Sequence, residues 1–428
     1  MSDRNYLPWW RLDNAAKIFP STSSAHDSKV FRFFCELEEA VEPAALQSAL
    51  DRTMERFPIY RCVLRRGWFW YYLEDSPLPA AARPEELPPC FPIYPSLRRS
   101  LLFRVLYYRR RISLEIYHVL SDGAGALDFL RDLVYEYLRI RHPEAGFPAG
   151  SVLAPGVSER QKEADSFQKY YEKPARRFGL SPSAYQIRGE RLPKNQLAIL
   201  EGRIPTRELL ACARSRGVTL TELLTAVLLR AIYDGMRVRD RKKPVAVTIP
   251  VNLRNYFPSF SSRNFFAIFH VSYDFSKNPD CLEAVLASVK KDFQEKLTAE
   301  QLKAQMNGLC ALEHNFPARI APLPLKDIVL RCANRMAAHA ATASFSNVGR
   351  VSMPEGAEKY IRQFGVLTCA GCLQACAVSF ENSFVITFAS PFRSRETERV
   401  FFQELSRLGL DITLTTNMKD EVEQNAVL

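Results

Sequence analysis

Residues 117–123 read YHVLSDG, and they place the imidazole of His118 between an apolar strand and a glycine turn. The residues before the turn alternate, so that Leu114 and Ile116 share the face of His118 by the two-residue period of a strand. After the turn, apolar residues recur at helical spacing from 126 to 140. The segment therefore predicts a strand, a tight turn and an amphipathic helix, with a potential base where the strand ends.

The composition is that of an ordinary globular protein, with 47% hydrophobic and 25% charged residues in a chain of 428. This length exceeds what one core usually supports, and at roughly 150 residues per domain we expect two domains. Prolines interrupt every long pattern between about 142 and 194. We place the connection there, between an N-terminal domain at 1–180 and a C-terminal domain at 195–428.

Both halves alternate strand-like and helix-like segments, and neither contains a dinucleotide-type glycine loop. Strands are predicted at 30–37, 59–64, 68–73, 101–108, 112–118, 197–204, 244–250, 265–273, 343–347 and 366–368, with a hairpin over 377–388. Helices are predicted from Pro43, over 126–140, from Thr206 to Gly217, from Thr219 onward and over 396–408. Strands with amphipathic helices to cover them predict an α+β sandwich in each half.

No stretch approaches the roughly 20 apolar residues of a membrane span, and the N-terminus lacks the apolar run of a secretory signal. Ten cysteines without a dense spacing framework indicate free thiols in a cytoplasmic protein. The series Cys369-x-x-Cys372-x-x-x-Cys376 could begin a zinc or iron–sulfur site, but a fourth ligand at suitable spacing is missing. We expect these cysteines to be small packing residues, and we expect no bound metal.

The net charge of +11 and the pI near 9.2 favour an anionic partner. Nucleic acid, a membrane surface, a phosphorylated cofactor and an acidic carrier protein all fit this charge. The basic clusters at 109–111 and 237–243 do not belong to a recognisable nucleic-acid motif. We therefore expect no nucleic-acid partner, whereas charge alone leaves the other classes open.

The spacing His118-x-x-x-Asp122-Gly123 resembles the HxxxDG motif of the chloramphenicol-acetyltransferase-like acyltransferases and condensation domains. The resemblance covers most of the chain. A tryptophan-containing N-terminus and the segments 250–254, 262–265 and 346–349 follow in the order of the alcohol-acetyltransferase-like branch. The resemblance implies a pseudodimer of two similar domains, with a tunnel between them and His118 at its middle.

The resemblance also implies a thioester donor, either acyl-CoA or the phosphopantetheine of a carrier protein, and no permanently bound cofactor. A neutral imidazole can accept a proton from an alcohol or amine that attacks a thioester, and the thiolate leaves readily. A serine or cysteine nucleophile is not required. A histidine on an apolar face is more often a core residue, but the Asp-Gly turn and the matching segments favour His118 as the general base.

Asp122 has two interpretations. It could orient the imidazole as the carboxylate of a triad does, or it could cap the following helix. The resemblance favours an ion pair with Arg254, directed away from the tunnel. Gly123 and Gly125 suit a positive φ or a close backbone approach, and equally an ordinary turn.

Three further residues are candidates for the tunnel wall or the oxyanion site. The resemblance makes Ser346 and Asn347 candidate donors toward the thioester carbonyl or the pantetheine arm. Asn264 is a similar tunnel-lining candidate. Turn formation is the simpler alternative for Ser346 and Asn347.

Two departures narrow the choice of branch. Condensation domains carry two adjacent histidines, and here the first is Tyr117, which favours an acyltransferase. The DFGWG segment of the plant-type enzymes is absent. We expect a monomeric acyltransferase that uses acyl-CoA and a small-molecule acceptor. The alternatives are a freestanding condensation-type enzyme with an acidic acyl carrier protein, or a non-catalytic module that binds a lipid or a carrier.

Overall fold

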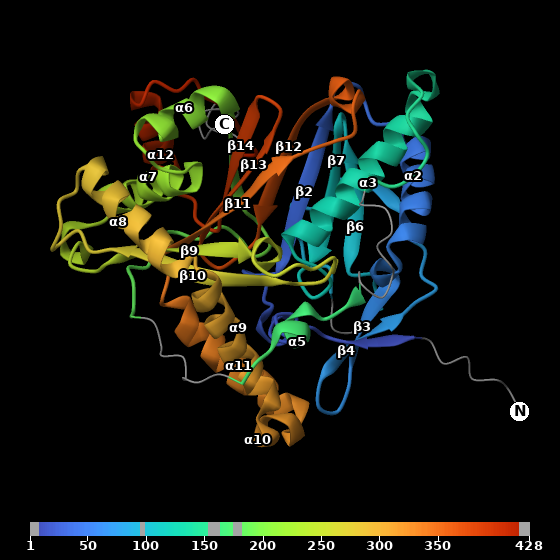
Figure 1. Cartoon of the computed structure of the whole chain (residues 1–428), viewed down its shortest axis with the longest axis horizontal. Coiled ribbons are helices and arrows are strands. Elements are labelled where there is room, and N and C mark those ends of the chain that lie inside the picture. The colour runs from blue at the N-terminus through green and yellow to red at the C-terminus, as the bar shows by residue number, and fades with distance from the viewer. Residues whose placement is uncertain (1–7, 95–98, 153–162, 174–181, 419–428) are drawn as a thin grey trace, which may run out of the picture.

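The computed structural model of the chain describes residues 8–94, 99–152, 163–173 and 182–418. Over these ranges the chain forms two lobes that lie side by side, each with a β-sheet covered by helices (Figure 1). The two-lobed α+β architecture predicted from the sequence is therefore confirmed.

The first lobe is built on a five-stranded sheet with the order β12-β2-β7-β6-β5. Its strands are β2 (Val30–Leu37), β5 (Ala82–Pro84), β6 (Phe103–Tyr108), β7 (Arg111–Tyr117) and β12 (Ile361–Thr368). Helices α2 (Pro43–Arg56) and α3 (Gly123–Arg141) cover one face (Figure 1). Each helix turns an apolar stripe to the sheet, so that Leu46 and Leu130 share one core with Phe33.

The second lobe is built on a seven-stranded sheet with the order β10-β9-β11-β13-β14-β8-β15. Its strands are β8 (Ala198–Pro205), β9 (Val245–Asn252), β10 (Phe266–Tyr273), β11 (Ala343–Val351), β13 (Leu373–Phe380), β14 (Ser383–Ser390) and β15 (Thr413–Thr416). The helices that share its core are α6 (Thr206–Ser215), α7 (Leu220–Asp234), α8 (Leu282–Lys296) and α12 (Glu396–Arg407). The predicted capping box is present at the start of α7, where Thr219 and Glu222 exchange hydrogen bonds.

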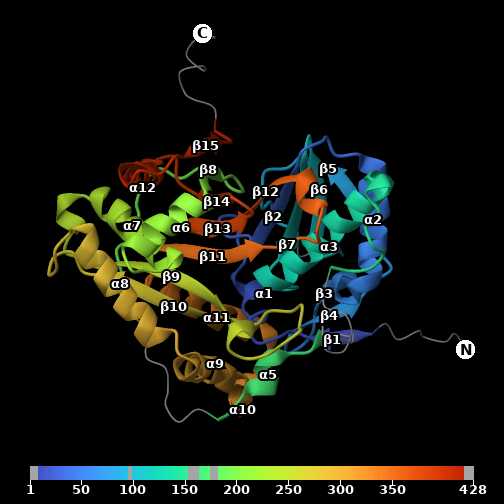
Figure 2. The same ribbon diagram turned by 45° about the horizontal axis from the view of Figure 1, so that its top comes forward.

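One strand from the second half of the sequence completes the sheet of the first lobe. β12 pairs antiparallel with β2, with Phe364 opposite Cys35, and Figure 2 shows the two strands side by side. The predicted connection at 142–194 lies partly outside the described residues, in 153–162 and 174–181. The predicted limits of the two domains stay a prediction.

Smaller elements lie below the two sheets in Figure 1. A three-stranded sheet has the order β1 (Trp9–Arg11), β4 (Tyr71–Asp75) and β3 (Cys62–Arg66). The remaining helices are α1 (Phe19–Thr22), α5 (Ser166–Tyr170), α9 (Ala299–His314), α10 (Phe316–Ile320) and α11 (Leu323–Ala338). Short 3₁₀ helices lie at Pro58–Arg61, Pro143–Ala145, Val238–Asp240, Leu253–Asn255 and Ala357–Tyr360. None of the described helices is both long and apolar enough to cross a membrane.

Candidate active site

His118 lies directly after β7, at the boundary between the two lobes. Its backbone N–H donates to the carbonyl of Lys29 at 2.9 Å, which fixes the turn to the start of β2. Three phenylalanine rings surround the imidazole. Phe19 and Phe31 have ring centres 4.8 Å from it, and Phe266 of the second lobe has its centre at 5.5 Å. The imidazole is therefore enclosed by aromatic rings from both halves of the chain.

Asn264 fixes the orientation and the tautomer of this imidazole. Its amide nitrogen donates to the carbonyl of His118 at 3.0 Å and to the carboxylate of Asp13 at 3.1 Å. The amide oxygen must then face Nδ1 of His118, 3.0 Å away, so Nδ1 carries the hydrogen and donates it. Nε2 keeps its lone pair and bonds to no other group in the described part of the chain. The geometry leaves Nε2 as a proton acceptor.

The surroundings keep the imidazole neutral. Burial lowers the pKa of His118 below its ordinary value, and the hydrogen bond to Asn264 and the charge of Asp122 only partly oppose this effect. Asp13, on the other side of Asn264, is fully buried, and burial raises its pKa to about 6 against the opposing charge of Arg263. The imidazole of His118 therefore keeps its lone pair at neutral pH.

Replacing Asn264 by alanine should lower kcat about tenfold to a hundredfold, because the imidazole loses the partner that orients it. This hydrogen bond raises the pKa of His118, so its loss should move the acidic limb of the pH profile of kcat to lower pH. Rate–pH profiles of both proteins would measure the shift. A lower melting temperature with an unmoved acidic limb would mean that Asn264 is only structural.

Asp122 is engaged entirely with groups other than the imidazole. One oxygen caps α3 and accepts from the N–H groups of Ala124 and Gly125 at 3.1 and 3.0 Å. The other accepts from Nη1 of Arg254 and from the N–H of Phe265, both at 2.7 Å. The helix cap and the ion pair expected from the sequence are both present, and the triad interpretation finds no support in these bonds.

Arg254 extends this anchor to the segment that carries Asn264. Its guanidinium also donates to the carbonyls of Ser261 and Arg263, at 2.8 and 2.6 Å. The Asp122–Arg254 pair therefore connects the turn after His118, in the first lobe, with the loop of the second lobe that orients the imidazole. It is a positioning device, buried at the junction of the lobes.

Of the two glycines expected to allow a close backbone approach, Gly123 and Gly125, only Gly125 makes one. A Cβ on Gly123 would meet only Phe33, at an ordinary 3.8 Å, and its φ is not positive. A Cβ on Gly125 would lie 2.2 Å from the carbonyl oxygen of Ser262. Gly125 is thus the residue that lets α3 and the loop of the second lobe come together.

The two candidates on β11 differ in their surroundings. The amide of Asn347 donates to the hydroxyl of Thr221 at 3.0 Å and accepts from the N–H of Gly349 at 3.1 Å, so it supports a turn and the start of α7. Ser346 lies opposite Cys376 in the parallel ladder, and its hydroxyl bonds to no other described residue. Their role toward a thioester stays a prediction.

The cysteine series does not form a cluster suited to a metal. Cys369 and Cys376 are buried, and Cys372 accepts a hydrogen bond from Gln374. Burial raises the pKa of the Cys372 thiol to about 11, which disfavours the thiolate that metals require. Among the described residues no group of three or more His, Cys, Asp or Glu side chains could hold a metal ion.

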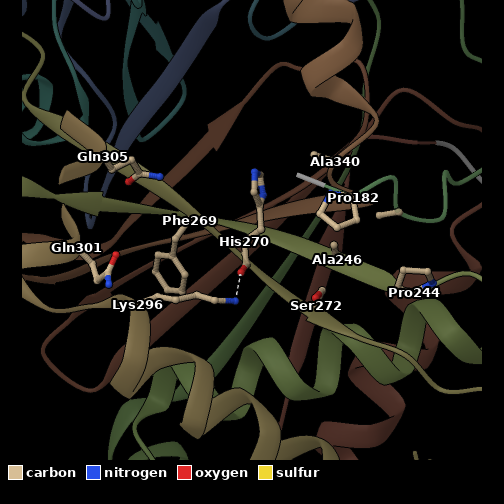
Figure 3. Close-up of a pocket in the computed structure, with 11 residues that line it drawn as sticks. Pro182, Pro244, Ala246, Phe269, His270, Ser272, Lys296, Gln301, Gln305 and Ala340 are labelled. Carbon is tan, nitrogen blue, oxygen red and sulfur yellow. Dashed lines mark hydrogen bonds between the residues drawn. The ribbon is translucent and has the colours of Figure 1, made fainter. Parts of the chain in front are cut away.

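A second histidine, His270, belongs to no recognisable sequence motif. It lines a cavity of about 290 Å³ beside edge strand β10 (Figure 3). Nδ1 of His270 lies 3.0 Å from the hydroxyl of Thr248, and Nζ of Lys296 donates to the carbonyl of His270 at 2.8 Å. Burial and the charge of Lys296 lower the pKa of His270. The alternation of Phe266, Ile268 and His270 along β10 was the available sequence signal.

No family model matches the sequence, and no curated protein matches it. Solved structures match it over almost its whole length. Polyketide synthase associated protein 5 from Mycobacterium tuberculosis is 14% identical with a TM-score of 0.57, and the match covers 95% of this chain and 98% of that one. TRI3 trichothecene 15-O-acetyltransferase from Fusarium sporotrichioides is 11% identical with a TM-score of 0.59, covering 95% and 96%. The starter condensation domain of rhizomide synthetase RzmA is 13% identical with a TM-score of 0.60, covering 94% of each chain.

At 11–14% identity these matches show a similar fold and no more. They cover 94–95% of this chain, which includes both lobes. The matched region includes β12, which completes the sheet of the first lobe, and His118. The chain therefore has the two-lobed, chloramphenicol-acetyltransferase-like fold that this acetyltransferase and this condensation domain share.

Proposed function

We propose that the protein is an acyltransferase that moves an acyl group from a thioester donor, acyl-CoA, to a hydroxyl or amine acceptor. The observation that carries the proposal is the imidazole of His118, whose Nδ1 is held by Asn264 while Nε2 bonds to none of the described residues. The fold likeness to an acetyltransferase and to condensation domains supports the same chemistry. One starter condensation domain was solved with C8-CoA and Leu-SNAC, which supports a thioester as donor.

In the proposed reaction, Nε2 of His118 takes the proton of the acceptor O–H or N–H as that atom attacks the thioester carbonyl. The carbonyl becomes a tetrahedral oxyanion, which then re-forms the C=O bond and expels the thiolate. The protonated imidazole returns its proton to the sulfur, so an ester or amide and a free thiol are released. Asn264 holds the ring throughout, because Nδ1–H keeps one partner in both protonation states.

The donor arm lies along β10 in this proposal. Phe266, Ile268 and His270 share one face of the strand, and the row runs about 13 Å from the ring beside His118 to the cavity. An extended pantetheine arm spans a comparable length. Lys296 at the cavity pairs with Asp292 at 2.9 Å and donates to His270, which leaves one N–H for a phosphate oxygen.

Replacing Lys296 by alanine should raise KM for acyl-CoA about tenfold with kcat unchanged, because a charged hydrogen bond to the donor phosphate is lost. Steady-state kinetics with acyl-CoA and with acyl-pantetheine, which has no phosphate, would measure this. Lys291→Ala is the matched control, since Lys291 is an exposed lysine of the same helix. An equal rise in KM for acyl-pantetheine would contradict the role of Lys296.

The decisive experiment for the function is thiol release from a panel of acyl-CoA donors, with alcohols and amines as acceptors and mass spectrometry of the product. Release only from an acylated carrier protein would identify the condensation-type alternative, and binding of the carrier without release would identify a binding module. We place the reaction in the cytoplasm, because all ten cysteines are free thiols. We propose that the enzyme acts as a monomer.

A further inference from the structure

A row of exposed apolar side chains lies on α11 and on the neighbouring loops. Trp68, at the tip of the β3–β4 hairpin, is 90% exposed, and the other members are all more than half exposed. We call this surface the apolar ridge, and it consists of Trp68, Ile320, Leu325, Ile328, Val329 and Met336. Patches of this kind mark interaction sites rather than ordinary surface.

The helical period explains why these side chains share one face. Leu325, Ile328 and Val329 are spaced by three and four residues, whereas Leu323 and Asp327 of the same helix are buried. The ridge is thus the outer side of an amphipathic helix whose inner side already packs on the protein.

The β3–β4 hairpin is hydrogen-bonded to α11. The carbonyl of Trp68 accepts from the N–H of Leu323 at 2.9 Å, and Nζ of Lys326 donates to the carbonyl of Phe69 at 2.8 Å. Nζ of Lys326 also lies 3.7 Å from the ring centre of Trp70. Figure 1 shows the hairpin beside α10 and α11 where these elements project from the body. The hairpin tip that carries Trp68 is therefore held beside α11.

Positive charge flanks the ridge. The sequence from 319 to 338 holds four cations and a single acid, Asp327. Asp327 is buried, where it accepts from the hydroxyl of Ser21 at 2.6 Å. Arg319, Arg331 and Arg335 are exposed. An apolar stripe flanked by arginines is the pattern of a helix that lies in a membrane interface.

We propose that the apolar ridge docks on the surface of an anionic lipid bilayer. Tryptophan favours the headgroup depth of a bilayer, which suits Trp68 at the projecting tip. Each arginine near an anionic surface adds attraction, whereas a second copy of the ridge would bring like charges together. The ridge is braced by α1, whose Phe19 packs against the imidazole of His118 and whose Ser21 bonds Asp327. Membrane docking by the apolar ridge does not depend on the proposed acyl transfer at His118.

Cosedimentation of the full chain with phosphatidylcholine vesicles, with and without phosphatidylglycerol, tests the docking. We expect binding to the phosphatidylglycerol vesicles that weakens as salt is added. Trp68→Ser with Ile328→Ser should lower the apparent affinity about a hundredfold, since each large apolar side chain contributes about tenfold. Arg319→Ala with Arg335→Ala should weaken binding to the anionic vesicles only.

The matched control replaces two exposed apolar residues elsewhere, Val238→Ser with Tyr108→Ser, and should bind vesicles as the native protein does. All replaced side chains are exposed, so melting temperatures should stay unchanged. Absence of binding to anionic vesicles would overturn the proposal, and so would equal binding by Trp68→Ser with Ile328→Ser. Self-association that this variant abolishes, without vesicle binding, would assign the ridge to a second copy instead.

Discussion

Alanine at position 118 should reduce the rate of thiol release about a thousandfold while leaving the melting temperature nearly unchanged. The large effect follows because the proposed mechanism makes Nε2 of His118 the proton acceptor, and alanine has no group that can replace it. The stability effect should be small because Asn264 keeps its bonds to the carbonyl of residue 118 and to Asp13 when the imidazole is removed. Thiol release with saturating acyl-CoA and acceptor is the measurement.

A histidine outside the site serves as the control for this variant. His142 stacks on Tyr360 with ring centres 4.0 Å apart, at the end of α3 away from His118. His142→Ala should keep the native rate. Native-like release by His118→Ala would remove the assigned base, and the proposed mechanism with it.

Local sequence patterns were sufficient to predict the strands and the helix that hold His118. The predicted strand at 30–37 coincides with β2, and the strand, turn and helix around residues 117–123 are present as predicted. Each of these elements has its own hydrophobic period, and α3 also has a capping residue, Asp122. The strand predicted at 59–64 is partly wrong, because Pro58–Arg61 forms a 3₁₀ turn before β3.

Contacts between residues far apart in the sequence could not be predicted from local patterns. Asn264 contacts His118 across 146 positions of sequence and Asp13 across 251, and no period or motif links such segments. Strand β12 likewise joins a sheet whose other strands lie far earlier in the chain. The sequence named Asn264 as a candidate lining residue, but its function as the partner of Nδ1 needed the folded arrangement.

The helices between 282 and 338 were not predicted, although signals were present. Thr298 caps α9 by accepting from the N–H of Gln301, a spacing that the sequence displays. α11 has its apolar stripe turned outward, with Ile328 and Val329 exposed. An apolar helix face has the same sequence period whether it is exposed or buried in a core. Only the structure shows that the apolar face of α11 is exposed.

Replacing Asp122 by asparagine should destabilise the fold by about 3–5 kcal/mol, because it removes the buried carboxylate that faces the mostly buried guanidinium of Arg254. The cap of α3 and the bond to Phe265 are weakened by the same change. Denaturant unfolding measures the loss. The control is Asp128→Asn on the same helix, where a partly exposed pair with Arg131 at 3.4 Å should contribute less than about 1 kcal/mol.

The pH profile distinguishes an anchor from a second base. The charge of Asp122 raises the pKa of His118, so its removal should lower that pKa further and move the acidic limb of kcat to lower pH, with the limb itself retained. The limb is retained because protonation of His118 at low pH still removes the lone pair of Nε2. An Asp122→Asn protein with native stability and no acidic limb would instead show that the carboxylate titrates as the base, and the division between His118 as base and Asp122 as anchor would be wrong.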